Sequence, residues 1–267
     1  MRNLLIVMSL VCAAVAAAFG ADNELTAKEK ADGWQLLFDG KTFSGWEDPT
    51  KKTPAGDAWA IEDGCLKATL NPRIAEDLYT AELFGDFEMV WDWKVAPVGN
   101  TGVKYRVQDR VFLEAAVPGQ KFEEQVNRSI KNRGAQRAAR STEYNVAFEY
   151  QLLDNERHPD GRRGPIHQSG ALYDMIPPSK DATRPVGEFN QSRLVVKGDH
   201  VEHWLNGEKV VDGSLNDPGV AQGTASRWGT ESPVYEMLVK HAKKMCPVSL
   251  QNHGEIAWFR NVKIRKL

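Results

Sequence analysis

The chain has 267 residues, 42 % of them hydrophobic, and a formal net charge of −2. This composition is ordinary for a globular protein. It excludes a general nucleic-acid binder, because such proteins carry a clear excess of Lys and Arg. The length suits one large all-β domain as well as two small ones.

The first twenty residues have the pattern of a signal peptide. Arg2 supplies the positive start, Leu4–Ala18 an apolar stretch, and Ala16–Ala18 a small-residue cleavage site. The stretch is short for a membrane-spanning helix. We therefore predict an exported protein, periplasmic or extracellular, with a signal peptide over 1–20, a leader over 21–32 and one domain over 33–267.

Short strands joined by turn residues dominate the first half of the domain. Residues 59–62 and 65–68 flank Asp63-Gly64, which predicts a tight hairpin. In residues 86–95, aromatic and aliphatic side chains alternate with mostly polar ones, as in a strand with one buried face. Residues 103–107 form the next expected strand, with Lys104 and Arg106 opposite its apolar side.

Residues 109–141 interrupt this rhythm. Phe122, Val126 and Ile130 recur every four residues, which predicts an amphipathic helix between Glu123 and Ala139. We interpret 109–141 as an insertion, either a solvated excursion or a lid over an open sheet face.

The stretch Glu143–Asn155 carries the strongest functional signal. Tyr144, Val146, Phe148, Tyr150 and Leu152 alternate with a second set that contains Glu149 and Gln151. The two polar side chains should therefore project side by side from one sheet surface. Asp154-Asn155 then favours a turn.

The second half continues as strands. Residues 190–197, 200–205 and 208–212 are three expected strands, and Asn206-Gly207 is a strong hairpin turn. We expect 217–228 to be a loop and 233–244 to be helical. Many short strands without βαβ alternation predict an all-β sandwich or jelly roll with a helical insertion. The two cysteines outside the signal, Cys65 and Cys246, leave a disulfide or two separate buried thiols open.

An ordered set of motifs gives the chain a resemblance to one family. The chain resembles the 3-keto-disaccharide hydrolase family, also described as 3-keto-glucoside 1,2-lyase/3-keto-2-hydroxy-glucal hydratase domains. The motifs that carry the resemblance are Gly33–Lys41, Gly45-Trp46, Gly85–Glu88, Gly99–Val103, Glu149–Asp154, Gly170–Tyr173, Pro178–Lys180, Arg184–Asn190, His203–Gly207, Leu250–Gly254 and Trp258–Asn261. The resemblance implies a concanavalin-like or laminarinase-like jelly roll. The insertion 109–141 and the segment near 234–244 depart from the family's pattern.

The resemblance also implies a carbohydrate substrate with a ketone at carbon 3. Such a ketone acidifies the hydrogen on carbon 2, so that a base can remove it, the group on carbon 1 leaves, and water adds to complete a net hydrolysis. This chemistry needs a base, an acid and a group that stabilises an oxyanion. Glu149, His203 and His253 compete for the base and acid roles.

Other residues complete the predicted site. Lys180 and Arg106 are candidates for stabilising the oxyanion. Gln151, Asn190 and Gln251 suit the recognition of sugar hydroxyls. One divalent cation held by Glu149, Asp154 and a histidine is an open alternative, since oxygen and imidazole ligands suit several metals.

Each candidate also has a structural interpretation. His203 alternates with Val201 and Leu205, so it can equally be a core histidine, and Asp154 can simply organise its turn. Two other functions remain open: a lectin-like sugar-binding module, and an ordinary glycosidase with a second acid, such as Glu188, opposite Glu149.

Overall fold

Two packed β-sheets form the body of the protein in a computed structural model, which describes residues 22–47, 56–132 and 141–267. The predicted signal peptide 1–20 lies outside the described residues. The described part of the larger sheet has eight strands. Seven of them follow one another side by side, and the eighth, β1 (Gln35–Leu36), pairs with β14 outside this main path. That path runs β12 (Glu208–Ser214), β11 (His200–Leu205), β10 (Asn190–Lys197), β7 (Phe87–Val95), β14 (Ala257–Lys266), β4 (Cys65–Ala68) and β3 (Trp59–Glu62).

The second sheet carries the outer face on which Glu149 lies. Its described strands run in the order β2 (Trp46–Glu47), β6 (Leu78–Thr80), β13 (Ser249–Leu250), β8 (Asn100–Phe112), β9 (Ser141–Leu153) and β5 (Ile74–Ala75). Adjacent strands are antiparallel except for β5 and β9. This arrangement confirms the predicted all-β sandwich of the jelly-roll type.

The period-2 patterns fix which side chains enter the core between the sheets. On β7, Phe87, Met89, Trp91, Trp93 and Val95 are all buried. On β9, Val146, Phe148, Tyr150 and Leu152 are buried from the opposite side. Glu149 and Gln151 therefore lie on the other face of the second sheet, as the alternation predicts.

Both predicted hairpin turns are confirmed. Asp63-Gly64 joins β3 to β4, and Asn206-Gly207 joins β11 to β12. All four residues have positive φ, the geometry of a type I′ turn, which Asn, Asp and Gly tolerate best.

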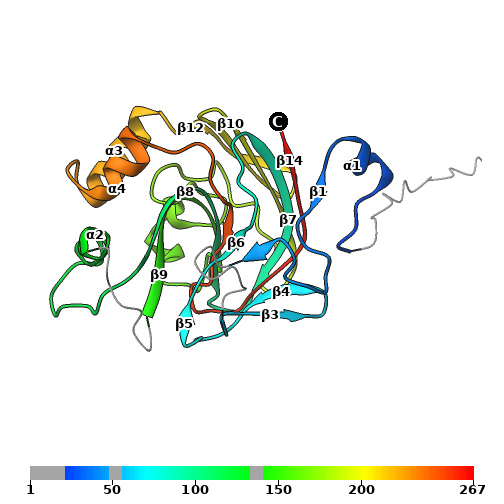
Figure 1. The fold of residues 1–267 in the computed structure, drawn as a ribbon, viewed down its shortest axis with the longest axis horizontal. Helices are drawn as coiled ribbons and strands as arrows, with labels where there is room; N and C mark the ends of the chain where they lie inside the picture. Colours follow the sequence, from blue (N-terminus) through cyan, green and yellow to red (C-terminus); the bar gives the residue numbers. More distant parts are fainter. Residues whose placement is uncertain (1–21, 48–55, 133–140) are drawn as a thin grey trace, which may run out of the picture.

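The helices are α1 (Ala27–Ala31), α2 (Phe122–Asn132), α3 (Pro218–Trp228) and α4 (Pro233–Tyr235), with a π-helical turn at Glu236–Lys240 after α4. Figure 1 shows α2, α3 and α4 gathered on one side of the molecule beside β8 and β9, with α1 on the opposite side near β1. None of the described helices combines the length and the apolar character that a membrane crossing requires.

Several boundaries differ from the sequence predictions. Residues 217–228, expected as a loop, form α3, because Asp217 caps the helix by accepting a hydrogen bond from Gly219 N and Pro218 occupies its first turn. The helix predicted between Glu123 and Ala139 is α2, and residues 133–140 lie outside the described residues. Cys65 and Cys246 are buried free thiols and do not pair.

Candidate active site

The floor of the candidate site is the outer face of β8 and β9. Glu149 on β9 lies opposite Lys104 on β8. Lys104 Nζ lies 3.0 Å from Asp77 Oδ2, and both side chains are almost fully buried. The amide of Gln251, oriented to satisfy its neighbours, donates to Glu149 Oε1 at 3.2 Å and accepts from Lys104 Nζ at 3.1 Å. Four polar side chains from different strands and connections thus form one network.

Further hydrogen bonds hold Asp77 in place beneath this network. Asn145 Nδ2 donates to Asp77 Oδ2 at 2.6 Å, and the hydroxyl of Tyr79 donates to Asn145 Oδ1 at 2.5 Å. Ser249 Oγ and the backbone amide of Asn252 add contacts of 3.3 Å to the same carboxylate. Because buried polar networks are stable only when their members are satisfied, these bonds position Lys104 beside Glu149.

Glu149 has the electrostatics of a proton-transfer group. Burial raises the pKa of its carboxyl above the ordinary value, while the charges of Lys104 and His253 oppose this shift. A carboxyl group with a raised pKa exchanges protons closer to neutral pH than an exposed one. Such shifts are common at functional sites.

Two histidines lie beside this floor. His253 Nδ1 lies 2.8 Å from Glu255 Oε2, and the ring of His158 packs edge-on against that of His253. Partial burial disfavours the protonated form of His253, but the hydrogen bond to Glu255 and its charge outweigh this and raise the pKa of the imidazole. Burial, together with the charge of His253, lowers the pKa of His158. The pair therefore consists of a readily protonated histidine beside a neutral one.

His158, His253 and Glu255 offer ligand atoms that all lie within 4.8 Å of one another. This donor set tests the metal alternative. The amide of Asp160 donates to His158 Nδ1 at 3.1 Å, so the neutral ring carries its proton on Nε2. A protonated nitrogen cannot bind a metal ion, which counts against His158 as a ligand in this tautomer. The contact of His253 Nδ1 with Glu255 does not exclude His253, since a metal-binding histidine commonly bonds a carboxylate through its other nitrogen. The tautomer of His158 therefore argues against a metal ion held by all three groups.

Helix α3 supplies the wall on the other side of Glu149. Arg227 contacts Asp174, and its Nε lies 3.4 Å from Glu123 Oε1 on α2. A cavity of about 30 Å³ lies against Glu149, and its lining includes Arg227, Asp174, Tyr173 and Trp228. A cavity of this size has room for about one water molecule.

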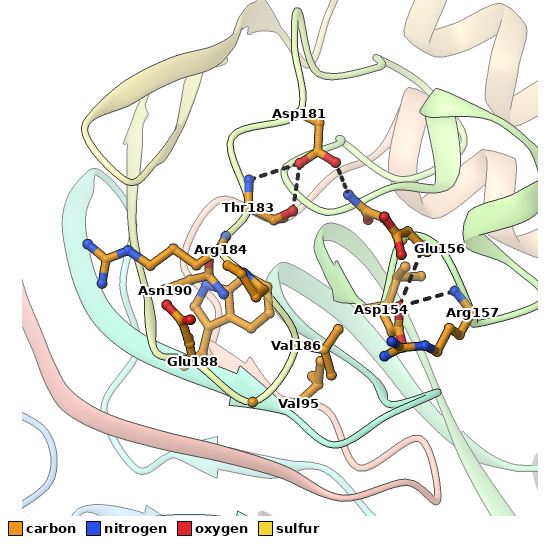
Figure 2. Close-up of a pocket in the computed structure, with 15 residues that line it drawn as sticks. Val95, Asp154, Glu156, Arg157, Asp181, Thr183, Arg184, Val186, Glu188 and Asn190 are labelled. Atoms are coloured by element: carbon orange, nitrogen blue, oxygen red, sulfur yellow. Dashed lines mark hydrogen bonds and ion pairs between the residues drawn. The ribbon is translucent and has the colours of Figure 1, made fainter.

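A second, larger cleft of about 360 Å³ lies at one end of the sandwich (Figure 2). It is bordered by the end of β7, by the turn after β9 and by the crossing 181–190. Asp154 and Asn190, two predicted site residues, lie in its walls rather than beside Glu149.

The structure corrects the prediction for His203. Its ring is fully buried between the sheets and stacks on Tyr150, with centroids 4.3 Å apart. Its two nitrogens lie 3.1 Å from the Tyr105 hydroxyl and 2.9 Å from the Gly170 carbonyl oxygen. Burial lowers the pKa of His203 to about 4, so this histidine stays neutral in the core and cannot reach a substrate.

Two cations predicted to stabilise an oxyanion also lie elsewhere. Lys180 is half exposed and pairs with Glu208 at 2.7 Å on the surface. Arg106, at a bulge of β8 with a positive φ, donates to the carbonyl oxygens of Lys244 and Gly198. The bulge turns Arg106 away from Glu149, and the lysine two residues earlier takes the place beside the carboxylate.

The predicted metal pair, Glu149 and Asp154, is not brought together. Asp154 follows Glu149 by five residue steps, which span about 16 Å along an extended chain. Asp154 instead organises its turn, accepting from Val98 N at 3.0 Å and Arg157 N at 3.1 Å. Gln151 accepts from the neighbouring amide of Leu152 and is almost fully buried.

Several residues of the site were missed by sequence reasoning, among them Asp77 and Glu255. Lys104 could have been found, since alternation already placed it on the polar side of its strand. His158 and Arg227 carried no local signal in the sequence. His158 lies in a turn and Arg227 in a segment that was expected to be a loop, and only tertiary folding brings both of them to Glu149.

Comparisons with known proteins agree with this architecture. The sequence model of the 3-keto-alpha-glucoside-1,2-lyase-like domain matches residues 33–265. The chain belongs to this family.

Relatives extend the match over most of the chain. A 3-keto-disaccharide hydrolase of Bacteroides thetaiotaomicron is 33 % identical over 254 residues, which cover 89 % of this chain and 79 % of the relative. A crystal structure of a Parabacteroides distasonis protein, described as a candidate glycosyl hydrolase, superposes with a TM-score of 0.69 at 30 % identity, covering 92 % of this chain and 99 % of that one. A second protein of that organism shares the fold at 21 % identity, with a TM-score of 0.56 and coverage of 88 % of this chain and 99 % of that one.

Proposed function

We propose that this carbohydrate-active enzyme cleaves 3-keto-glycosides by elimination across carbons 1 and 2, followed by hydration. The observation that carries the proposal is the desolvated carboxyl of Glu149 beside Lys104 and near the His253–Glu255 pair, in a chain of this family. The name of the Bacteroides relative supports a 3-keto-disaccharide as the substrate class.

In the proposed reaction each of these groups has a role. The carboxylate of Glu149 takes the proton from carbon 2, and the electron pair forms an enediolate on carbons 2 and 3. The enediolate collapses to restore the ketone, a double bond forms between carbons 1 and 2, and the bond from carbon 1 to the leaving oxygen breaks. Protonated His253 gives its proton to that oxygen. Water then adds its hydroxyl group to carbon 1 and gives its remaining proton to neutral His253, while protonated Glu149 returns a proton to carbon 2.

The surroundings stabilise the negative charge that develops on the oxygen attached to carbon 3. Arg227 borders the same cavity as Glu149 and presents a guanidinium from α3. The neutral Nε2–H of His158 is a donor beside His253. Donors that are fixed before the reaction stabilise an oxyanion without reorganisation in the transition state.

The test compares a 3-keto-glucoside with its unoxidised parent in deuterated water, using wild type, Glu149→Gln and the exposed control Glu124→Gln. We expect turnover of the keto sugar only, deuterium at carbon 2 of the product, and loss of turnover in Glu149→Gln alone. Turnover of the parent sugar would establish an ordinary glycosidase instead. Sugar binding without turnover would establish a lectin-like module.

We also propose that the protein is exported to the periplasm or the extracellular space. The support is the signal-peptide pattern of residues 1–20. N-terminal sequencing of the mature protein after fractionation of the producing cells tests this, and a mature protein that still begins at Met1 would contradict it.

A further inference from the structure

The cleft at the end of the sandwich is separate from the proton-transfer groups around Glu149. Its walls come from the turn 154–157, the crossing 181–190 and the end of β7, and Figure 2 shows these residues arranged around a central hollow. Its volume of about 360 Å³ falls within the range of small-molecule sites, and it is much larger than the cavity beside Glu149.

Hydrogen bonds fix the walls of the cleft. The carboxylate of Asp181 accepts from Thr183 N at 2.9 Å, from Thr183 Oγ1 at 2.7 Å and from Asn155 Nδ2 at 3.1 Å, so it ties the crossing to the turn after β9. Asn190 Oδ1 accepts from Arg184 N at 2.7 Å and from Asn206 Nδ2 at 2.8 Å. A ligand that enters the cleft therefore meets a largely ordered surface.

The chemistry of the lining favours a ligand with hydroxyl groups over an anion. Four carboxylates, from Asp154, Glu156, Asp181 and Glu188, outnumber the guanidiniums of Arg157 and Arg184, which disfavours an anion. Carboxylates and guanidiniums side by side offer acceptors and donors, and a hydroxyl group uses both. Pro185 and Val186 add apolar surface against which the C–H face of a ring can pack.

We propose that this cleft is a carbohydrate-binding subsite for a neutral sugar unit, distinct from the reaction centre. The choice of a sugar as the ligand rests on the proposed function. The turn after β9 links the two places, since its residues 154–157 line the cleft while His158 packs against His253. The subsite thus lies where it can hold a part of the substrate beyond the bond that is cleaved.

The test measures binding of unoxidised glucose disaccharides, which are not turned over in the proposed reaction, by saturation-transfer NMR on the full mature chain. Val186→Phe fills the cleft, and Val117→Phe is the matched control at an exposed valine that does not line it. We expect Val186→Phe to weaken binding at least tenfold, while Val117→Phe and Glu149→Gln bind as wild type does.

Three results would overturn the proposal: no binding to wild type, equal binding to Val186→Phe, or loss of binding in Glu149→Gln, which would place the sugar on the catalytic face. Circular dichroism and melting temperature establish that Val186→Phe is folded. Should that variant be unstable, Glu188→Gln replaces it, with Glu124→Gln as the control. None of these outcomes depends on turnover, so failure of the subsite is distinguishable from failure of the proposed reaction.

Discussion

Replacing Lys104 by methionine tests the buried network under the candidate site. The side chains of Lys104 and Asp77 are only 5 % and 3 % exposed, and their charged atoms lie 3.0 Å apart. Methionine has a similar length but no charge, so the carboxylate of Asp77 is left buried without its cation. Breaking a buried pair in this way costs about 3–5 kcal/mol. The remaining donors to Asp77, including Asn145 and Ser249, place our expectation near the lower end, at about 3 kcal/mol.

Urea denaturation of the four members of a double-mutant cycle with Asp77→Asn measures this loss. We expect Lys104→Met to cost about 2 kcal/mol less in the Asp77→Asn background than in wild type, because residue 77 no longer carries a carboxylate that loses its cation. Unchanged m-values would show that the denatured state is the same. A cost below about 1 kcal/mol, or equal costs in both backgrounds, would refute the reasoning.

The same substitution has a catalytic readout. The charge of Lys104 lowers the pKa of Glu149, which burial raises, so removing the charge lets that pKa rise further. As the proposed base acts as a carboxylate, the acid limb of the kcat/KM profile should move to higher pH. An acid limb that stays in place would show that Lys104 does not act on the base.

The remaining predictions concern other residues of the site and its surroundings. Burial raises the pKa of Glu149 in the folded state above its value in the unfolded state. The free energy of unfolding therefore falls as the pH rises from the unfolded-state pKa through the folded-state pKa, because the folded protein has to hold a buried carboxylate. Glu149→Gln carries no such charge, so at pH 8 its melting temperature should equal or exceed that of wild type. A melting temperature of Glu149→Gln below that of wild type at pH 8 would count against a desolvated carboxylate. Burial lowers the pKa of His203 in the folded state to about 4. The neutral ring therefore contributes on the order of 3 kcal/mol to the free energy of unfolding above the unfolded-state pKa of about 6.5, and this contribution is lost as the pH falls to about 4. When the free energy of unfolding is measured by urea denaturation at several pH values, His203→Phe should lack this loss between about pH 6.5 and about pH 4. An identical dependence on pH in wild type and His203→Phe would refute the core assignment. Lys180→Met breaks only an exposed pair with Glu208, so we expect unchanged turnover and a stability within about 0.5 kcal/mol of wild type. A chelator such as EDTA should leave turnover unchanged, since the Asp160 amide holds the proton of His158 on Nε2; loss of turnover that is restored by one divalent metal would contradict this.

Local patterns in the sequence determined the strands and their faces. The alternation in 86–95 and 143–153 predicted which side chains enter the core, because each residue of a strand points to the face opposite its neighbours. Asp63-Gly64 and Asn206-Gly207 predicted their hairpins because few residue pairs adopt two consecutive positive φ angles. The ordered motifs also indicated the family, which the comparisons confirm.

Tertiary structure alone decided which polar side chains meet. Alternation put His203 on the same face as Val201 and Leu205, and only the second sheet packed over that face makes it a core residue. A bulge in β8 removed Arg106 from the site and left Lys104 beside Glu149. His158 and Arg227 come to Glu149 from a turn and a helix distant in sequence, and nothing local in the chain encodes such long-range convergence. The sequence determined which faces are polar, because that depends on neighbours along the strand, whereas the composition of the site depended on contacts between segments far apart in the chain.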